Sequence, residues 1–275
     1  MEAEELRKDF PIFGRRDVAY LDNAATSQKP EKVIEALEDF YRSKNSNVGR
    51  GLYELASEAT VSYRNARKDL ASFTGVSEEE IVFVRGCTEG MNLIASSLDI
   101  EGDVAVSELS HHSEQLPWRE HLGEEGVKYL PVEHGVIDVE EAERIIDSGV
   151  SVVCVSHVSN VFGTEQPVDS LVDIAHDNDA LVVLDAAQSV PHMPVDFREL
   201  DVDFAVFSGH KMLGPTGIGV IYGRRELLER MEPYQVGGGM VDSVKRNEID
   251  YAPIPEKFEA GTPNIAGAVG LSAAV

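Results

Sequence analysis

One lysine stands at the end of an apolar run in the stretch FAVFSGHKMLGPTGIG, residues 204–219. A lysine amine becomes a nucleophile only after it loses its proton, and burial or a neighbouring cationic group lowers its pKa far enough for that. Lys211 follows the apolar run FAVF at a short distance and is adjacent to His210. The pattern therefore predicts a reactive amine that attacks a carbonyl carbon, and the alternative is an ordinary lysine in a surface loop.

An aspartate and a pair of histidines also follow apolar runs that we expect to be strands. Asp185 follows the apolar run LVVL, where a carboxylate can keep a pyridinium nitrogen protonated and make a cofactor ring an electron sink, or can simply cap a turn. The pair His111 and His112 raises the possibility of a metal site. Adjacent side chains at a strand end point to opposite sides, and no further histidine or cysteine has ligand-like spacing. We therefore expect no metal, and one imidazole that stacks on an aromatic cofactor.

A turn of glycine, cysteine and threonine, residues 86–88, follows the run IVFVR and opens a helical pattern. The free N–H groups and the dipole of a helix N-terminus bind anions, so this turn predicts a phosphate site. Thr88 as a plain N-cap is the alternative. The stretch GPTGIG lies between two expected strands without a helix, which does not favour a dinucleotide site.

The elements that must position these residues form an alternating pattern of apolar runs and amphipathic segments. That pattern is typical of an α/β protein with a mostly parallel sheet, whose ligands collect beyond the carboxyl ends of the strands. The expected helices cover residues 30–44, 57–75, 88–98, 139–147 and 168–179, and the expected strands cover residues 81–86, 103–109, 127–132, 150–158, 180–188, 204–210 and 218–223.

Composition excludes several classes of protein. The chain has 275 residues, 43% of them hydrophobic, and a net charge of −25 at pH 7. Such an acidic chain disfavours nucleic acid as a partner, and no apolar run reaches the roughly 18 residues that a membrane span needs. We expect a cytoplasmic protein adapted to high salt, with an acidic mesophilic protein as the alternative. Two cysteines form no disulfide framework, and Cys154 reads as a core residue.

The motifs resemble those of a known family. In order they are YLDNAAT, RGCTEGMNL, SHHSEQLPW, VSNVFGT, LDAAQSV, SGHKMLGPTGIGV, GGGM and FEAGTPN, and they run from Tyr20 to the last residue. The sequence is similar to the pyridoxal-phosphate (PLP) enzymes of fold type I, in the class V aminotransferase group, and within it to the SufS-like cysteine desulfurases. The resemblance implies a three-layer α/β sandwich with a PLP-binding large domain over residues 20–262. Residues 1–19 would belong to the small domain, and residues 263–275 would begin a helix that links to a C-terminal domain absent here.

The resemblance also assigns roles to residues of this sequence. Lys211 would form an imine with PLP and move a proton at the substrate α-carbon. Asp185 would pair with the pyridine nitrogen, and His111 would stack on the ring. Gln188 would bond the phenolic oxygen with Asn160 close by, and Arg50 and Asn160 would contact the substrate. The phosphate would be held by the turn that contains Cys87, by Thr88, Ser208 and His210, and by Thr262 from the partner subunit of a homodimer.

Departures from the family pattern bear on function. Gly49 and Tyr53 stand where relatives carry histidines, and Glu114 stands where asparagine is usual. The family's sulfur-accepting cysteine and its carboxylate-binding arginine belong to the C-terminal domain, so we expect them beyond residue 275. Cys87 does not replace that cysteine, because a neighbouring phosphate would raise the pKa of its thiol.

The resemblance implies a PLP-dependent cysteine desulfurase that converts L-cysteine to L-alanine and an enzyme-bound persulfide. A sulfur-acceptor protein and iron–sulfur cluster assembly would lie downstream. One alternative is another class V enzyme, such as an amino-acid lyase, epimerase or aminotransferase, which the histidine losses at Gly49 and Tyr53 favour. Another is a truncated, non-catalytic paralogue that binds PLP or a partner subunit.

Overall fold

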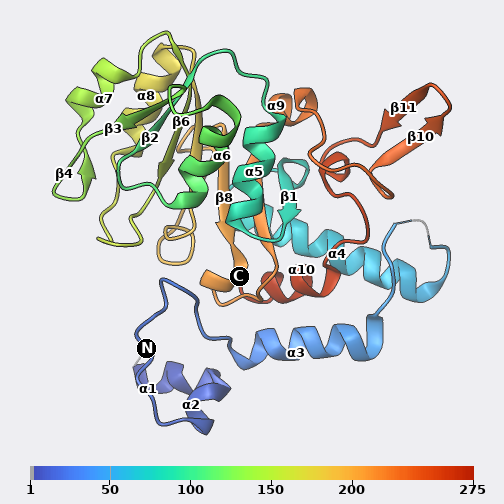
Figure 1. Cartoon of the computed structure of the whole chain (residues 1–275). Helices are drawn as coiled ribbons and strands as arrows, with labels where there is room; N and C mark the ends of the chain where they lie inside the picture. Colours follow the sequence, from blue (N-terminus) through green and yellow to red (C-terminus); the bar gives the residue numbers. More distant parts are fainter. Residues whose placement is uncertain (1–2, 50) are drawn as a thin grey trace.

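A seven-stranded sheet forms the centre of the molecule in the computed structural model, which describes residues 3–49 and 51–275 (Figure 1). The strand order is β1-β9-β8-β7-β6-β2-β3. Only β9 runs antiparallel to its neighbours within this sheet, and the other pairings are parallel. The strands are β1 (Ile81–Val84), β2 (Asp103–Ser107), β3 (Val127–Leu130), β6 (Val150–Ser156), β7 (Leu181–Asp185), β8 (Phe204–Ser208) and β9 (Gly219–Gly223). Each strand expected from the sequence is present in this sheet, and the mostly parallel α/β fold is confirmed.

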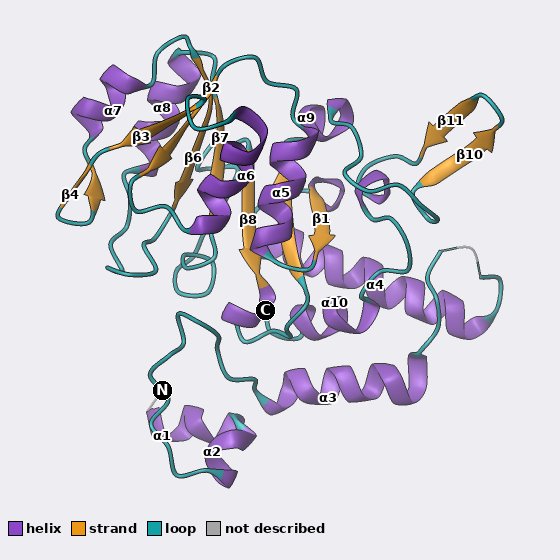
Figure 2. Ribbon diagram, viewed as in Figure 1, coloured by secondary structure: helices purple, strands orange, loops and turns teal. Residues whose placement is uncertain are grey.

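Helices cover both faces of the sheet, which gives three layers (Figure 2). Val82 and Val84 of β1 pack with α5 (Cys87–Ser97), α6 (His112–Leu122) and α9 (Arg225–Arg230). Ile81 and Phe83 pack on the other face with α4 (Glu54–Phe73), α7 (Val139–Ile145), α8 (Val168–Asp177) and α10 (Ile265–Ser272). Successive side chains of a strand point to opposite faces, so strands covered on both sides must be apolar throughout.

The N-terminal helices lie below the sheet in Figure 1, away from its central strands. They are α1 (Ala3–Leu6), α2 (Pro11–Arg15) and α3 (Glu31–Asp39), and α3 continues as a π-helix over Phe40–Lys44. Two small hairpins were not expected: β4 (Val132–Glu133) with β5 (Val136–Ile137), and β10 (Val241–Lys245) with β11 (Glu248–Tyr251). Short 3-10 turns cover Arg7–Asp9, Glu78–Glu80, Gly209–Lys211 and Glu256–Phe258. Within the described ranges, no helix combines the length and apolar character that crossing a membrane requires.

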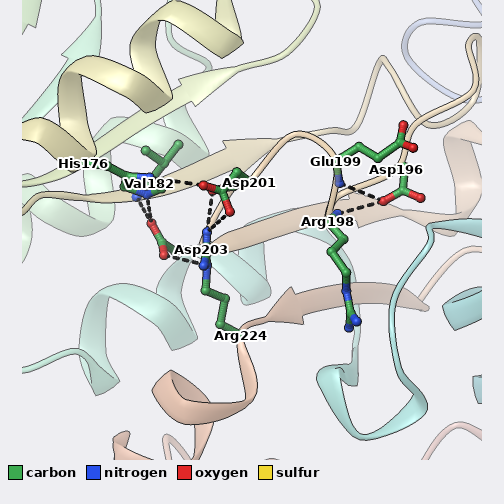
Figure 3. Close-up of polar contacts among 8 residues, drawn as sticks. All are labelled: His176, Val182, Asp196, Arg198, Glu199, Asp201, Asp203 and Arg224. Atoms are coloured by element: carbon green, nitrogen blue, oxygen red, sulfur yellow. Dashed lines mark hydrogen bonds and ion pairs between the residues drawn. The ribbon is translucent and has the colours of Figure 1, made fainter.

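A charged cluster fixes β7 and β8 at the edge where these strands begin (Figure 3). Asp203, which is 5% exposed, accepts a hydrogen bond from Val182 N at 2.7 Å. The same carboxylate pairs with His176 Nε2 at 3.0 Å and Arg224 Nε at 2.9 Å. Nearby, Asp196 Oδ1 accepts hydrogen bonds from the backbone N–H groups of Arg198 and Glu199. This edge is therefore structural, and the opposite edge carries the polar residues singled out from the sequence.

Candidate active site

A cavity of about 400 Å³ opens at the carboxyl edge of the parallel strands. The parallel pairing brings the strand ends together, with Ser156 beside Asp185 and Asp185 beside Val206. All but one of the predicted cofactor-binding residues line the cavity: Cys87, Thr88, His111, Asn160, Asp185, Gln188, Ser208, His210 and Lys211. The fold therefore brings these side chains to one cavity, as expected from their positions at the ends of parallel strands.

Asp185 lies at the inner wall of this cavity and is 7% exposed. Its Oδ1 accepts a hydrogen bond from Ala187 N at 2.8 Å, and its Oδ2 accepts one from Cys87 Sγ at 3.2 Å. Burial, together with the negative charge of Asp185, raises the pKa of the Cys87 thiol well above its ordinary value. Cys87 therefore stays protonated and donates to the carboxylate, as a group that orients Asp185 and not as a nucleophile.

Cys87 and Thr88, the first two residues of α5, line the same cavity. Cys87 N donates to Ser208 Oγ at 2.8 Å, and Gly90 N donates to Gly86 O at 3.1 Å. Among the described residues, no acceptor takes the N–H groups of Thr88 and Glu89, so they are available to an oxyanion. The N-cap of α5 is Gly86, which rules out Thr88 as the cap.

Four hydrogen bonds on one carbonyl oxygen hold the turn that carries Lys211. His210 O accepts from Ser27 N at 2.9 Å, Ser27 Oγ at 3.0 Å, Thr26 Oγ1 at 3.1 Å and Lys29 Nζ at 2.9 Å. Sequence reasoning missed these contacts. The motif YLDNAAT was noticed, but it gave no sign that the residues after it would reach His210. The N-terminal segment therefore anchors the lysine turn.

The two lysines near this turn differ in their partners. Lys29 Nζ also donates to Ser27 O at 2.6 Å, and burial lowers the pKa of Lys29 to about 8. Lys211 is half-buried, lines the cavity and makes no hydrogen bond or ion pair through its amine within residues 3–49 and 51–275. Burial, followed by the charges of Lys211 and Lys29, lowers the pKa of His210. Lys211 is therefore the amine free to react.

His111 is the N-cap of α6, and its exposed ring borders the cavity. Nδ1 accepts a hydrogen bond from Ser113 N at 3.2 Å and lies 2.7 Å from Ser113 Oγ. The His112 ring lies 6.2 Å away between centroids, and the described chain contains no group of three or more potential metal ligands. These bonds fix the orientation of the His111 ring at the rim.

Gln188 is attached to the same N-terminal segment as the lysine turn. Its Nε2 donates to Ala24 O at 2.8 Å, which leaves the amide oxygen for a ligand. Thr262 does not line this cavity, and it borders two others beside Tyr63 and Glu259. Of the two predicted substrate residues, Asn160 lines the cavity and Arg50 lies outside the described residues.

Two of the three positions that depart from the family pattern, Gly49 and Tyr53, have local structural roles. Gly49 has a φ of 98°, in the region that favours glycine, and its N–H donates to Thr60 Oγ1 at 3.1 Å. Tyr53 precedes α4 and its hydroxyl lies 2.7 Å from Ser46 Oγ. Neither residue lines the cavity of Lys211.

Comparisons with known proteins give a consistent result. A probable cysteine desulfurase of Halalkalibacterium halodurans is 46% identical over 100% of this chain and 71% of its own length. The cysteine desulfurase of Haloferax volcanii is 42% identical over 100% of this chain and 71% of that protein. The apo structure of a cysteine desulfurase from Thermococcus onnurineus NA1 superposes with a TM-score of 0.93 at 42% identity, covering 100% of this chain and 70% of that one. The family model described as aminotransferase class V matches residues 19–275, and the chain therefore belongs to the class V aminotransferase family.

Proposed function

We propose that this chain carries the cofactor site of a PLP-dependent cysteine desulfurase, which converts L-cysteine to L-alanine and an enzyme-bound persulfide. The observation that carries the proposal is the shared cavity of Lys211, Asp185 and the α5 N-terminus. The relatives named as cysteine desulfurases over the whole length of the chain support the same activity.

The residues present fit PLP in size and in chemistry. A cavity of about 400 Å³ is within the usual range for small-ligand sites. The unpaired N–H group of Thr88, with Ser208 and His210 close by, would hold the phosphate. When bound, the cofactor supplies an aldehyde that joins an amine and a ring that accepts electron density. Asp185 would keep the ring nitrogen protonated, and His111 and Gln188 would fix the ring from the rim.

The chain's own residues account for proton handling. Lys211 would take a proton from the substrate α-carbon and return it, which suits a half-buried amine without a competing partner. Asn160 lines the cavity and would help to orient the substrate. The thiol that accepts sulfur is neither Cys87 nor Cys154, because burial raises the pKa of both thiols and neither side chain is accessible.

The experiment is a titration of the purified chain with PLP, followed by the visible absorption band of the imine. Wild type is expected to develop the band, Lys211→Ala to lack it, and Lys32→Ala, an exposed lysine on α3, to match wild type. Persistence of the band in K211A would remove Lys211 from its role. Incubation with L-cysteine then identifies the reaction: alanine supports a desulfurase, pyruvate indicates a lyase, and absence of turnover with a normal band favours a non-catalytic PLP-binding paralogue.

Finer features stay predictions. A homodimer in which the partner subunit adds Thr262 would complete the phosphate site, and a sulfur-acceptor protein and iron–sulfur cluster assembly follow only from the resemblance. A cytoplasmic location is expected from the composition of the sequence. Adaptation to high salt is supported by the net charge of −25. Unfolding measured against potassium chloride concentration tests it, since full stability at low salt would contradict a halophilic protein.

A further inference from the structure

Glu114 is a fully buried carboxyl group in the wall of the cofactor cavity, with 0% of its surface exposed. It is the third residue of α6, where its Oε1 accepts from His111 N at 3.0 Å and closes a capping box. The same oxygen accepts from Ser156 Oγ at 2.6 Å. The second oxygen, Oε2, is buried without a hydrogen-bond partner in the described part of the chain.

An ionised carboxylate is unstable in this position. A buried polar atom without a partner carries its full desolvation cost, and that cost is larger for a charged group. Burial, followed by the negative charge of Asp185, raises the pKa of Glu114 to about 8, although its hydrogen bonds from Ser156 and His111 favour the charged form. The protonated acid carries no charge, so it avoids the larger part of that cost, and its second oxygen becomes a hydroxyl donor.

The surroundings of Glu114 contain few groups that could offset a second negative charge. The cationic or potentially cationic side chains that border the cavity in the described chain are Lys211, His111 and His210, and no ion pair joins any of them to Glu114. The titratable and polar groups that face Glu114 are Ser110 and the N-cap residue His111 just before α6, Cys87 on α5, Cys154 and Ser156 on β6, and Asp185 on β7.

We propose that Glu114 is a positioning residue of this site that holds a proton in the cofactor-free chain, so that Asp185 is the sole anionic carboxylate facing the cavity. The geometry behind this is one carboxyl group with two bonds on Oε1 and none on Oε2, within the wall that contains Asp185. The second part of the inference rests on the proposed function. A cation that binds beside Asp185, as a protonated ring nitrogen would, offsets the charge that keeps Glu114 neutral, and Glu114 then releases its proton to solvent more readily.

The first test uses the cofactor-free chain, so it does not depend on the proposed function. A group whose folded-state pKa lies above its unfolded value stabilises the folded state at low pH, and this stabilisation is lost as the pH rises through the window between the two values. Relative to E114Q, whose amide does not titrate, the wild-type unfolding constant is expected to rise on the order of tenfold per pH unit between about pH 5 and about pH 8.

The matched control is Glu120→Gln, which changes an exposed carboxylate on the same helix. Its profile is expected to stay parallel to that of wild type, and a parallel profile for E114Q would overturn the proposal. If E114Q does not fold, NMR of isotope-labelled glutamate in the wild-type chain decides the question. A buried carboxyl that titrates near neutral pH supports the proposal, and titration of every glutamate in the acidic range overturns it.

The second test measures the PLP dissociation constant from the visible band against pH. The ratio of the constants for E114Q and wild type is expected to rise with pH, on the order of tenfold if the two charges couple by one pKa unit. A ratio independent of pH overturns the coupling to the cofactor. A wild-type chain that never develops the band overturns the proposed function instead, and the result of the cofactor-free test then still stands.

Discussion

Glu259 forms a buried ion pair whose loss should strongly destabilise the chain. It lies in the FEAGTPN motif just before Thr262, and its two oxygens accept hydrogen bonds from Arg67 Nη1 and Nη2 at 2.8 Å each. Phe83 N and the Tyr63 hydroxyl donate to the same carboxylate at 2.8 and 2.9 Å. Both charged side chains are 6% exposed. Burial favours a lower pKa for Arg67, but the charge and hydrogen bonds of Glu259, together with the charges of Tyr63 and Glu256, outweigh this effect and leave the pKa raised.

The perturbation is Glu259→Gln, which keeps the shape and removes the charge. Arg67 would then remain buried without a counter-ion, and one of its N–H groups would face the new amide donor. Breaking a buried pair in this way costs about 3–5 kcal/mol, a large share of the roughly 5–15 kcal/mol that stabilises a typical domain. The measurement is the free energy of unfolding in urea, from the midpoint and slope of the transition.

Two further variants make the test decisive. Glu229→Gln breaks the exposed pair between Glu229 and Arg225, whose side chains are 52% and 58% exposed, and should lower the free energy of unfolding far less than E259Q does. The double variant Arg67→Met with Glu259→Leu should be more stable than E259Q alone, because it leaves no unpaired charge. Equal losses for E259Q and E229Q would refute the claim that burial gives this ion pair its weight.

The remaining predictions concern the amino edge of the sheet, the lysine turn and the thiols. Asp203→Asn should lower the free energy of unfolding by about 1–3 kcal/mol, because Arg224 loses its buried counter-ion; unchanged urea unfolding would contradict this. Lys29 has a pKa of about 8 in the folded chain, so the unfolded state binds more protons above that pH, and wild type should gain stability relative to Lys29→Met between about pH 8 and pH 10.5. A constant difference between the two would argue against a depressed pKa. Cys87 and Cys154 should resist a thiol reagent in the native chain and react in urea, and a rapidly reacting native thiol would show that the cavity wall opens.

The sequence predicted the central sheet because the signal for a strand buried on both faces is local. Each of the seven apolar runs became a strand of that sheet. Helix α6 was not expected, since it contains Pro117 and begins at the two histidines that were read as a strand end. The hairpin of β10 and β11 was missed as well, because its exposed residues show little of the burial pattern that marks a core strand.

Residue type and position after a strand were enough to single out Lys211, Asp185 and the turn at Thr88, because a parallel sheet brings its carboxyl ends to one edge. Contacts between distant segments required the tertiary structure. Thr26 and His210 meet across 184 residues, and Arg67 and Glu259 across 192. The isolated Oε2 of Glu114 likewise exists only once helix, strand and cavity wall have packed. Local pattern thus determined which groups could do chemistry. Packing decided which of them lie free, which are held in place and which are buried without a partner, since burial and pairing depend on neighbours far away in the chain.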